Sequence, residues 1–370
     1  MAALDARTGN ELWRWYAIPK PGEPGSETWK DKNNAWKTGG GGLWQTGSYD
    51  PATRLTIWGT GNPVPQYDPS RAPATTSTPT PAVALDIDTG KLVWHFQYTP
   101  NDSWDYDEVG IHMLYDVTIN GETRKVVSAI SRRNGFFYSL DRGNGSFIKG
   151  SQYVERAELD QGARSQDRQA GRIRSAARRA EISSRRRAAL RGDGMKRTCP
   201  TWHGGVAHQP TAYNPVKQHR LRRRHRRLLH ARTALTAAFK GPGRRSRPRE
   251  VQQAHLYQRS LLRLDAPPTT PSTTRSLAKA VTDIEIRSGA LVTAGGLVFT
   301  ALQDGWVVAY DDEKLEELWR FNVGTPLKGA PVTYAIGPKQ YLAVQSSGRH
   351  LHPVKYDNLE SSSYLFDVRA

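Results

Sequence analysis

Short stretches of alternating or continuous apolar residues run through both ends of the chain, a pattern typical of β-strands. Examples are 55–58 (LTIW), 125–130 (KVVSAI) and 296–300 (GLVFT). Clusters of Gly, Pro, Asn and Asp separate these stretches and indicate turns between them. No apolar run approaches the roughly 20 residues that a membrane-spanning helix needs. The pattern therefore predicts an all-β chain built from many short strands.

One strand–turn–strand pattern recurs along the chain. The full copies are 3–13 (ALDARTGNELW), 84–94 (ALDIDTGKLVW) and 309–319 (AYDDEKLEELW). In each copy an Asp follows the first Ala by two positions, and a Trp follows that Ala by ten. The Asp ends a strand, and the Gly of the first two copies permits a tight turn with positive φ. Partial copies occur at 48–51 (SYDP), 139–145 (SLDRGNG) and 212–215 (AYNP).

A tryptophan that returns once per repeat suits a β-propeller, where it can pack one blade against the next. The alternative is a set of unrelated β-hairpins that share turn chemistry. Three copies in one register favour the repeat. We therefore predict an all-β partial β-propeller.

The chain has 370 residues and a formal net charge of +18, and its excess arginine lies in the middle. Segments 154–198 and 219–250 are rich in Arg and lack strand periodicity. They are consistent with a nucleic-acid-binding arm, a solvated basic helix, or sequence read out of frame. We favour the out-of-frame interpretation, because a GC-rich gene read in another frame yields Arg, Ala, Pro and Ser in this proportion. Propeller-like sequence also resumes abruptly on both flanks.

This interpretation divides the chain into three parts. Residues 1–153 are expected to form propeller blades that carry a cofactor and metal site. Residues 154–278 are expected to be Arg-rich and irregular or disordered, apart from 199–218, which resembles the flanks. Residues 279–370 are expected to form C-terminal blades.

An acidic stretch at 101–110 (NDSWDYDEVG) is the first candidate for chemistry. Asp105 and Asp107 stand two positions apart, with Asp102 and Glu108 close by. In an extended segment the side chains of residues i and i+2 point to the same side. Two carboxylates on one side repel each other, so a positive group should compensate them. The alternative is a solvated acidic loop.

Several runs together resemble the pyrroloquinoline-quinone-dependent alcohol dehydrogenases, the methanol and ethanol dehydrogenases built on an eight-bladed propeller. The longest are 38–51 (TGGGGLWQTGSYDP), 58–65 (WGTGNPVP), 84–107 (ALDIDTGKLVWHFQYTPNDSWDYD), 132–142 (RRNGFFYSLDR) and 295–311 (GGLVFTALQDGWVVAYD). Taken together these runs are specific, although no single one would be. The Trp repeat corresponds to the tryptophan-docking motif of that family.

The resemblance implies a set of site residues. Trp44 matches the tryptophan that forms the floor beneath the planar quinone, and Asn62, 18 positions later, matches an amide ligand of the metal ion. Asp105 matches the catalytic aspartate, which also belongs to the metal site. Asp107 matches the additional metal-binding aspartate of the lanthanide-using branch. Arg133, 28 positions after Asp105, matches the arginine that hydrogen-bonds the quinone oxygens.

The resemblance also implies an activity. Asp105 would act as general base on a primary alcohol, whose hydride moves to metal-bound pyrroloquinoline quinone and leaves an aldehyde. The metal ion would be Ca²⁺ or a lanthanide, and Asp107 favours the lanthanide. Electrons would pass to a cytochrome c in the periplasm, although the first residues, MAALDARTG, show no apolar stretch of a secretory signal. A homodimer is compatible with the family, and nucleic acid is not an expected partner.

Some positions depart from the family pattern. The adjacent-cysteine disulfide and a glutamate metal ligand of the family would lie before residue 3. Residues 206–210 read VAHQP where relatives often show V-N-W-Q-P, and Arg287 stands where relatives often carry Trp. These departures leave three alternatives open: an inactive chain, a non-catalytic propeller scaffold, and a basic nucleic-acid-binding protein. The last is disfavoured because no aromatic residues are interleaved with the Arg runs.

Overall fold

The described part of the chain consists of strands and turns. The computed structural model describes residues 1–23, 26, 34–37, 40–62, 81–99, 106–119, 121–129, 133–152, 206, 208–217, 219–225, 260–265, 276–284, 286–346 and 363–368. Within these ranges there is a short 3-10 turn at Ala35–Lys37 but no α-helix. None of the described segments is therefore a helix long and apolar enough to cross a membrane. The prediction of an all-β chain is confirmed.

The described strands form six antiparallel sheets, which we number in chain order. The first sheet pairs β1 (Ala2–Leu4) with β2 (Glu11–Arg14). The second sheet contains β3 (Ser48–Asp50), β4 (Leu55–Gly59), β5 (Pro81–Asp86) and β6 (Leu92–Gln97). The third contains β7 (His112–Ile119), β8 (Glu122–Ala129), β9 (Phe136–Asp141) and β10 (Phe147–Gln152).

The C-terminal sheets follow the same order. The fourth sheet contains β11 (Ala212–Asn214), β12 (His219–His225), β13 (Ser260–Asp265) and β14 (Ser276–Thr282). The fifth contains β15 (Ile286–Val292), β16 (Leu297–Leu302), β17 (Trp306–Asp311) and β18 (Glu317–Asn322). The sixth contains β19 (Val332–Ile336), β20 (Lys339–Gln345) and β21 (Ser363–Val368).

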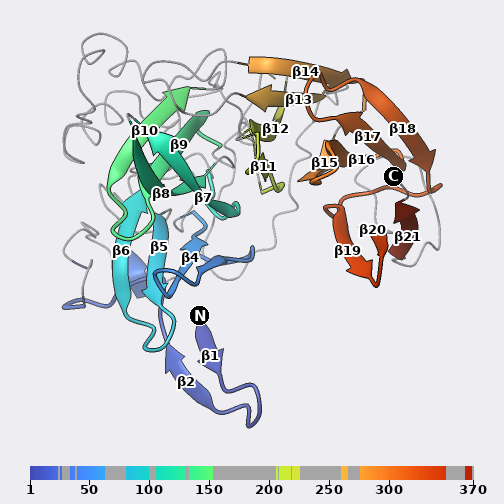
Figure 1. Cartoon of the computed structure of the whole chain (residues 1–370). Coiled ribbons are helices and arrows are strands. Elements are labelled where there is room, and N and C mark those ends of the chain that lie inside the picture. Colours follow the sequence, from blue (N-terminus) through green and yellow to red (C-terminus); the bar gives the residue numbers. More distant parts are fainter. Residues whose placement is uncertain are drawn as a thin grey trace, which may run out of the picture.

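The sheets follow one another round an arc, with β14 and β18 on its outer side (Figure 1). The first strands of neighbouring sheets contact each other: β3 contacts β7, and β11 contacts β15. Apolar cores fill the spaces between sheets. The core between the second and third sheets includes Ile57, Trp94 and Leu140, all buried. Antiparallel sheets that pack face to face around an arc are the arrangement of a β-propeller, as predicted.

The repeat has the predicted structure in all three copies. The paired residues are Ala3 with Trp13, Ala84 with Trp94, and Ala309 with Trp319, each followed by the same shift in register. The Asp that precedes the turn fixes it: Asp86 Oδ1 accepts the N–H groups of Asp88 at 3.1 Å and Thr89 at 2.8 Å. Asp side chains commonly form such Asx turns, so the Asp in the sequence already indicates the turn.

Two of the three repeated tryptophans, Trp13 and Trp94, pack one sheet onto the next, whereas Trp319 is 40% exposed. Trp13 lies over Gly90, where a Cβ atom would come within 2.4 Å of the indole, and Trp94 lies over Gly145, where it would come within 2.7 Å. The indole N–H of Trp94 also donates to the Arg142 carbonyl oxygen at 3.2 Å. Glycine is required at these turns both for the positive φ and for the close approach of the ring.

The segments SYDP and AYNP differ in placement from the prediction. They form first strands, β3 and β11, whereas the full copies at 84–94 and 309–319 begin on third strands, β5 and β17. The same local chemistry explains the sequence likeness: Asp50 Oδ1 accepts the Ala52 N–H at 3.2 Å, and Asn214 Oδ1 accepts the Val216 N–H at 3.0 Å. An Asx turn marks the end of a strand but not its position in the sheet.

Part of the middle segment is also more regular than its sequence predicts. Strand β12, with the sequence HRLRRRH, pairs with β11 and β13, and the predicted boundary at 278 falls inside β14. Backbone pairing with neighbouring strands needs no alternation of side chains, so it can impose a strand where periodicity is absent. Residues 154–198 and 226–259 lie outside the described part of the chain.

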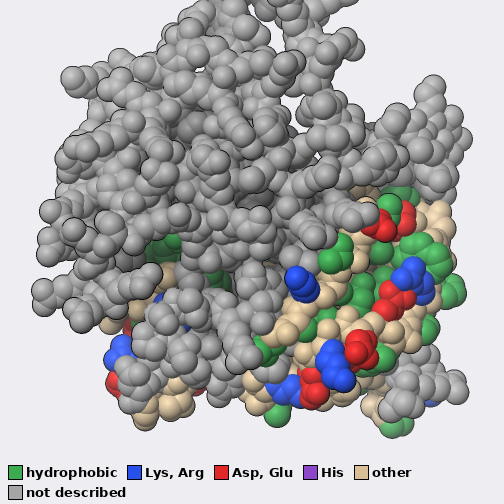
Figure 2. Space-filling view, turned by 90° about the horizontal axis from the view of Figure 1, so that it is seen from above, with side chains coloured by type: hydrophobic (Ala, Val, Ile, Leu, Met, Phe, Trp, Pro, Cys, Tyr) green, Lys and Arg blue, Asp and Glu red, His purple; other side chains and the backbone are tan. Residues whose placement is uncertain are grey.

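The described surface seen in Figure 2 carries acidic, basic and hydrophobic side chains side by side.

Candidate functional site

The predicted site residues come from connections at one end of the sheets. In an antiparallel meander, the segment leading into the first strand and the turn between the second and third strands lie at the same end, here called the proximal end. Trp44 precedes β3, Asn62 follows β4, Asp107 precedes β7, and Arg133 lies between β8 and β9. The Asp–Gly turns of the tryptophan repeat lie at the opposite end. Topology alone therefore brings these four residues to one end.

Asp107 is the centre of the cluster. Its Oδ2 lies 3.1 Å from Arg133 Nη2, and its Oδ1 accepts the backbone N–H of Asn62 at 2.8 Å. Asp107 and Arg133 are 8% and 9% exposed, so this is a buried ion pair and not a solvated acidic loop. The compensating positive charge expected from the sequence is present for Asp107. Asp105 lies outside the described residues, and its role stays a prediction.

Backbone hydrogen bonds tie the segment before Trp44 to this cluster. The N–H of Gly41 donates to the Asn62 carbonyl oxygen at 2.9 Å, and the N–H of Gly61 donates to the Gly42 carbonyl oxygen at 2.8 Å. A Cβ atom at Gly61 would lie 3.0 Å from that oxygen and 3.1 Å from Asp107 Oδ1. Glycine at this position lets two connections and a carboxylate meet.

Trp44 presents an aromatic surface at the same end. Its side chain is 46% exposed, and its ring meets that of His208 edge-on, with centroids 5.3 Å apart and planes at 65°. His208 belongs to the VAHQP segment that precedes β11, where the sequence departs from the family pattern. The indole thus keeps a face on which a planar ligand can stack.

Three further buried polar residues adjoin the cluster, and no motif drew attention to them as a group. The hydroxyl of Thr99 donates to Glu108 Oε1 at 2.8 Å, and Asn134 Nδ2 donates to Thr99 Oγ1 at 3.1 Å. Glu108 and Asn134 directly follow Asp107 and Arg133 in sequence. The acidic stretch and the RRNG run contain two of them, whereas nothing in the sequence marks Thr99.

Two more cations lie on proximal connections of the fifth and sixth sheets. Arg287 stands at the start of β15, and Lys328 precedes β19. Burial, and after it the charge of Arg287, lower the pKa of Lys328. The charge of Arg133 is already matched by Asp107, so Arg287 and Lys328 are the further cations at this end that would attract an anionic ligand.

The residues present fit a planar anionic cofactor, and they supply part of a metal site. Trp44 offers an aromatic face, Arg133 a fixed cationic donor, and Asp107 and Asn62 offer oxygen ligands of the kind that hard cations prefer. Among the described residues there is no group of three His, Cys, Asp or Glu side chains close enough to hold a metal ion.

Comparison with known proteins identifies the family. The model for the glucose, ethanol and alcohol dehydrogenase β-propeller domain, PQQ, matches residues 1–169 and 249–342. The quinohemoprotein alcohol dehydrogenase of Comamonas testosteroni is 32% identical over 93% of this chain and 49% of its own length. The lanthanide-dependent methanol dehydrogenase of Methylacidiphilum fumariolicum is 30% identical over 94% of this chain and 57% of its own length.

The structural comparison agrees. The crystal structure of the quinohemoprotein alcohol dehydrogenase from Comamonas testosteroni superposes with a TM-score of 0.72 at 28% identity, covering 93% of this chain and 52% of that one. The chain thus spans about half the length of the relatives that it matches. The family match covers most of the described sheets, the whole N-terminal flank and the C-terminal flank up to residue 342. The chain therefore belongs to the family of PQQ-dependent glucose, ethanol and alcohol dehydrogenases with a β-propeller domain.

Proposed function

We propose that this chain is the cofactor-bearing part of a quinoprotein that oxidises a primary alcohol to an aldehyde. The observation that supports it most is the buried ion pair of Asp107 and Arg133, with the backbone of Asn62 bonded to Asp107, at the same end as the exposed Trp44. A buried ion pair contributes little to stability on average, which makes a functional explanation of this one more attractive. Relatives whose names describe alcohol dehydrogenases support the reaction class.

Trp44 and Arg133 would hold pyrroloquinoline quinone. When bound, the quinone supplies an electrophilic carbonyl that accepts a hydride from the substrate. The indole of Trp44 would stack beneath the planar rings, and the guanidinium of Arg133 would donate to the quinone oxygens. Since Arg133 is fixed by Asp107 and buried, its charge is preorganised to stabilise negative charge that develops there.

Asp107 and Asn62 would ligate the metal ion beside the quinone. Each Asp107 oxygen already has one partner, but a carboxylate has about four acceptor positions, so it retains capacity for a cation. Asp105 would add a second carboxylate. The greater negative charge suits a trivalent lanthanide better than Ca²⁺, and a relative that is a lanthanide-dependent methanol dehydrogenase supports that choice.

Asp105 would take the proton from the alcohol hydroxyl as general base. Electrons would then pass to a cytochrome c, and the protein would act in the periplasm. A relative named lupanine 17-hydroxylase [cytochrome c] supports such an acceptor. A homodimer stays a prediction.

The test is reconstitution of the purified chain with pyrroloquinoline quinone and LaCl₃ or CaCl₂, with alcohol-dependent dye reduction as the readout. We expect turnover with lanthanum that falls by roughly 100-fold or more in Asp107→Asn, because a metal ligand is lost. Asp88→Asn is the matched control, since Asp88 also pairs with an arginine, Arg54, but on the surface. Activity that is absent from the wild type, or equal in the two variants, would contradict the proposal.

Two further measurements distinguish the alternatives. A non-catalytic scaffold predicts that Asp105→Ala changes only local stability, and a basic nucleic-acid-binding protein predicts steeply salt-dependent binding of RNA or DNA.

A further inference from the structure

We propose that Thr99 is a positioning residue that couples the segment carrying Asp107 to the segment carrying Arg133, through Glu108 and Asn134. The inference deepens the proposed function and rests on it. Nothing in the family resemblance assigns a role to Thr99, Glu108 or Asn134 in this chain. The inference follows from the way two pairs of sequence neighbours, Asp107–Glu108 and Arg133–Asn134, lie beside each other.

The two segments meet twice. The first members of each pair, Asp107 and Arg133, meet directly at 3.1 Å. The second members, Glu108 and Asn134, meet through the Thr99 hydroxyl, at 2.8 Å and 3.1 Å. The result is a closed ring of contacts: the ion pair on one side, the threonine bridge on the other, and backbone between.

The direction of each hydrogen bond in the bridge is fixed. Asn134 Oδ1 accepts the Phe136 N–H at 3.0 Å, and its Nδ2 also donates to the Tyr98 carbonyl oxygen at 3.2 Å. The amide therefore presents its N–H₂ group to Thr99, whose oxygen must accept. The single hydroxyl hydrogen of Thr99 is then left to donate to Glu108.

Burial makes this bridge consequential. Glu108 is 0% exposed, Asn134 3% and Thr99 5%. In surroundings of low dielectric, hydrogen bonds are stronger and an unmade one costs more than it does at the surface. Thr99 and Glu108 lie near the two ends of the connection from β6 to β7, whereas Asn134 lies on the connection between β8 and β9 of the third sheet. The bridge therefore fixes the connection between the two sheets against the β8–β9 connection, where Arg133 must be oriented.

The experiment uses the full chain and compares Thr99→Val with Thr99→Ser. Valine keeps the shape of threonine and removes the hydroxyl, whereas serine keeps the hydroxyl. Thr118→Val is the matched control, because Thr118 is an exposed threonine on β7. Two quantities are measured: the Kd for pyrroloquinoline quinone from quenching of tryptophan fluorescence, and amide hydrogen exchange of residues 106–110 and 133–136.

We expect Thr99→Val to weaken quinone binding about tenfold, the loss of one buried hydrogen bond. Exchange in 106–110 and 133–136 should accelerate about tenfold, with β15–β18 unchanged. Thr99→Ser should restore both quantities, and Thr118→Val should alter neither. If Thr99→Val binds quinone as the wild type does, or if serine fails to rescue, the positioning role is wrong.

A wild type that binds no quinone would refute the proposed function but not the coupling. In that case exchange alone decides: selective acceleration in the two segments of Thr99→Val supports the bridge, and unchanged exchange overturns it.

Discussion

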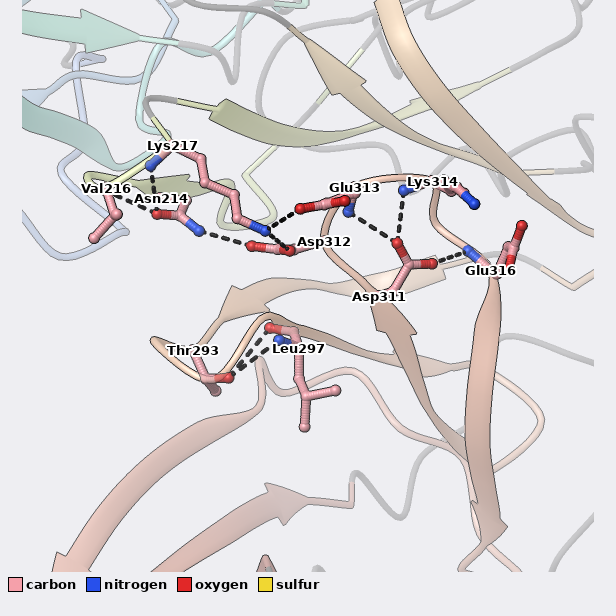
Figure 3. Close-up of polar contacts among 10 residues, drawn as sticks. All are labelled: Asn214, Val216, Lys217, Thr293, Leu297, Asp311, Asp312, Glu313, Lys314 and Glu316. Carbon is pink, nitrogen blue, oxygen red and sulfur yellow. Dashed lines mark hydrogen bonds and ion pairs between the residues drawn. The ribbon is translucent and has the colours of Figure 1, made fainter. Parts of the chain in front are cut away.

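The junction between the second and third sheets and the junction between the fourth and fifth are built on one plan with different side chains. In the first, Asp50 of β3 pairs with Arg142, the residue after the turn aspartate of the next sheet, at 2.7 Å. In the second, Asn214 of β11 stands at the position of Asp50, and Asp312 stands at the position of Arg142. The side-chain amide of Asn214 donates to Asp312 at 2.7 Å. Lys217 completes the second junction with a 2.7 Å ion pair to Asp312 (Figure 3).

The two junctions also differ at the position of the docked tryptophan and at the turn position that faces it, and the two differences match each other. Trp94 of β6 lies over Gly145 of the third sheet. At the fourth sheet, Ala278 stands in the register position of that tryptophan, opposite Leu264 and just before the same shift in register, and Leu315 stands in the turn position of that glycine. Leu315 has a φ of +59° and is only 4% exposed, packed in the core between the fourth and fifth sheets. Its own side chain fills space that an indole fills elsewhere.

The strand arrangement is thus the same at both junctions, whereas the side chains that meet there differ and are matched to each other. A charge on one sheet selects its partner on the next, and a large residue on one side goes with a small one on the other. Exchanging single members between junctions should therefore be destabilising, even where the new residue occurs naturally at the equivalent place.

The largest effect is expected from Arg142→Met. The change leaves the Asp50 carboxylate, 2% exposed, without its cation, and a buried unpaired charge costs about 3–5 kcal/mol. Urea denaturation should show that loss of unfolding free energy. Arg54→Met, which breaks the exposed pair with Asp88, should cost less than about 1 kcal/mol. Equal losses in the two variants would mean that burial does not set the strength of the junction.

Gly145→Ala should be the next largest. The added Cβ would meet Trp94 at a φ of +72°, so strain and overpacking together should cost about 2–4 kcal/mol. Gly9→Ala is the control, because Gly9 has a φ of +74° but nothing within 4 Å of the added atom. Its cost should be only the backbone term, about 1 kcal/mol, in the same denaturation assay. A control as costly as Gly145→Ala would exclude a role for the docked tryptophan.

Tyr310, in the core between the fourth and fifth sheets, should make this junction sensitive to alkali. Burial raises the pKa of Tyr310 to about 12. The unfolded chain therefore loses this proton near pH 10 and the folded chain near pH 12, so stability declines as pH rises above 10. The decline should reach about 1.4 kcal/mol at pH 11. Tyr310→Phe should remove this part of the alkaline loss, and a variant with an unchanged pH profile would contradict the prediction.

Lys328→Met should give the smallest effect, a small gain in unfolding free energy at neutral pH. The lowered pKa of Lys328 means that its charged form is less stable in the folded chain than in the unfolded one. This penalty is present at neutral pH and is relieved as pH rises through the folded pKa. Thermal melting at pH 7 and again above pH 10.5 should show a gain that disappears at the higher pH.

Sequence analysis predicted the repeat because its signals are local. The Asp turn and the Trp opposite Ala need only one hairpin to be recognised. Thr99 was missed because its importance comes from two residues, Glu108 and Asn134, brought to it by the packing of different sheets. Strand β12 was missed because its partners, and not its own alternation of side chains, specify it. The cluster of Asp107, Asn62 and Arg133 was anticipated only through family spacing.

The out-of-frame interpretation of the Arg-rich segments stays a prediction. The family match omits residues 170–248, which contain most of both Arg-rich stretches. Resequencing the coding DNA and translating all three frames should restore turn-and-Trp repeats across that interval. A sound frame would contradict it and make nucleic-acid binding the next property to measure.

The most direct test of the site is a crystal structure of the chain grown with pyrroloquinoline quinone and a europium salt, with anomalous scattering used to locate the metal ion. We expect one strong anomalous peak at ligand distance from the Asp107 carboxylate and the Asn62 side chain. We also expect quinone stacked on Trp44 with Arg133 at its oxygens. An ion bound elsewhere, or a quinone that touches neither Trp44 nor Arg133, would show that the site is assigned wrongly.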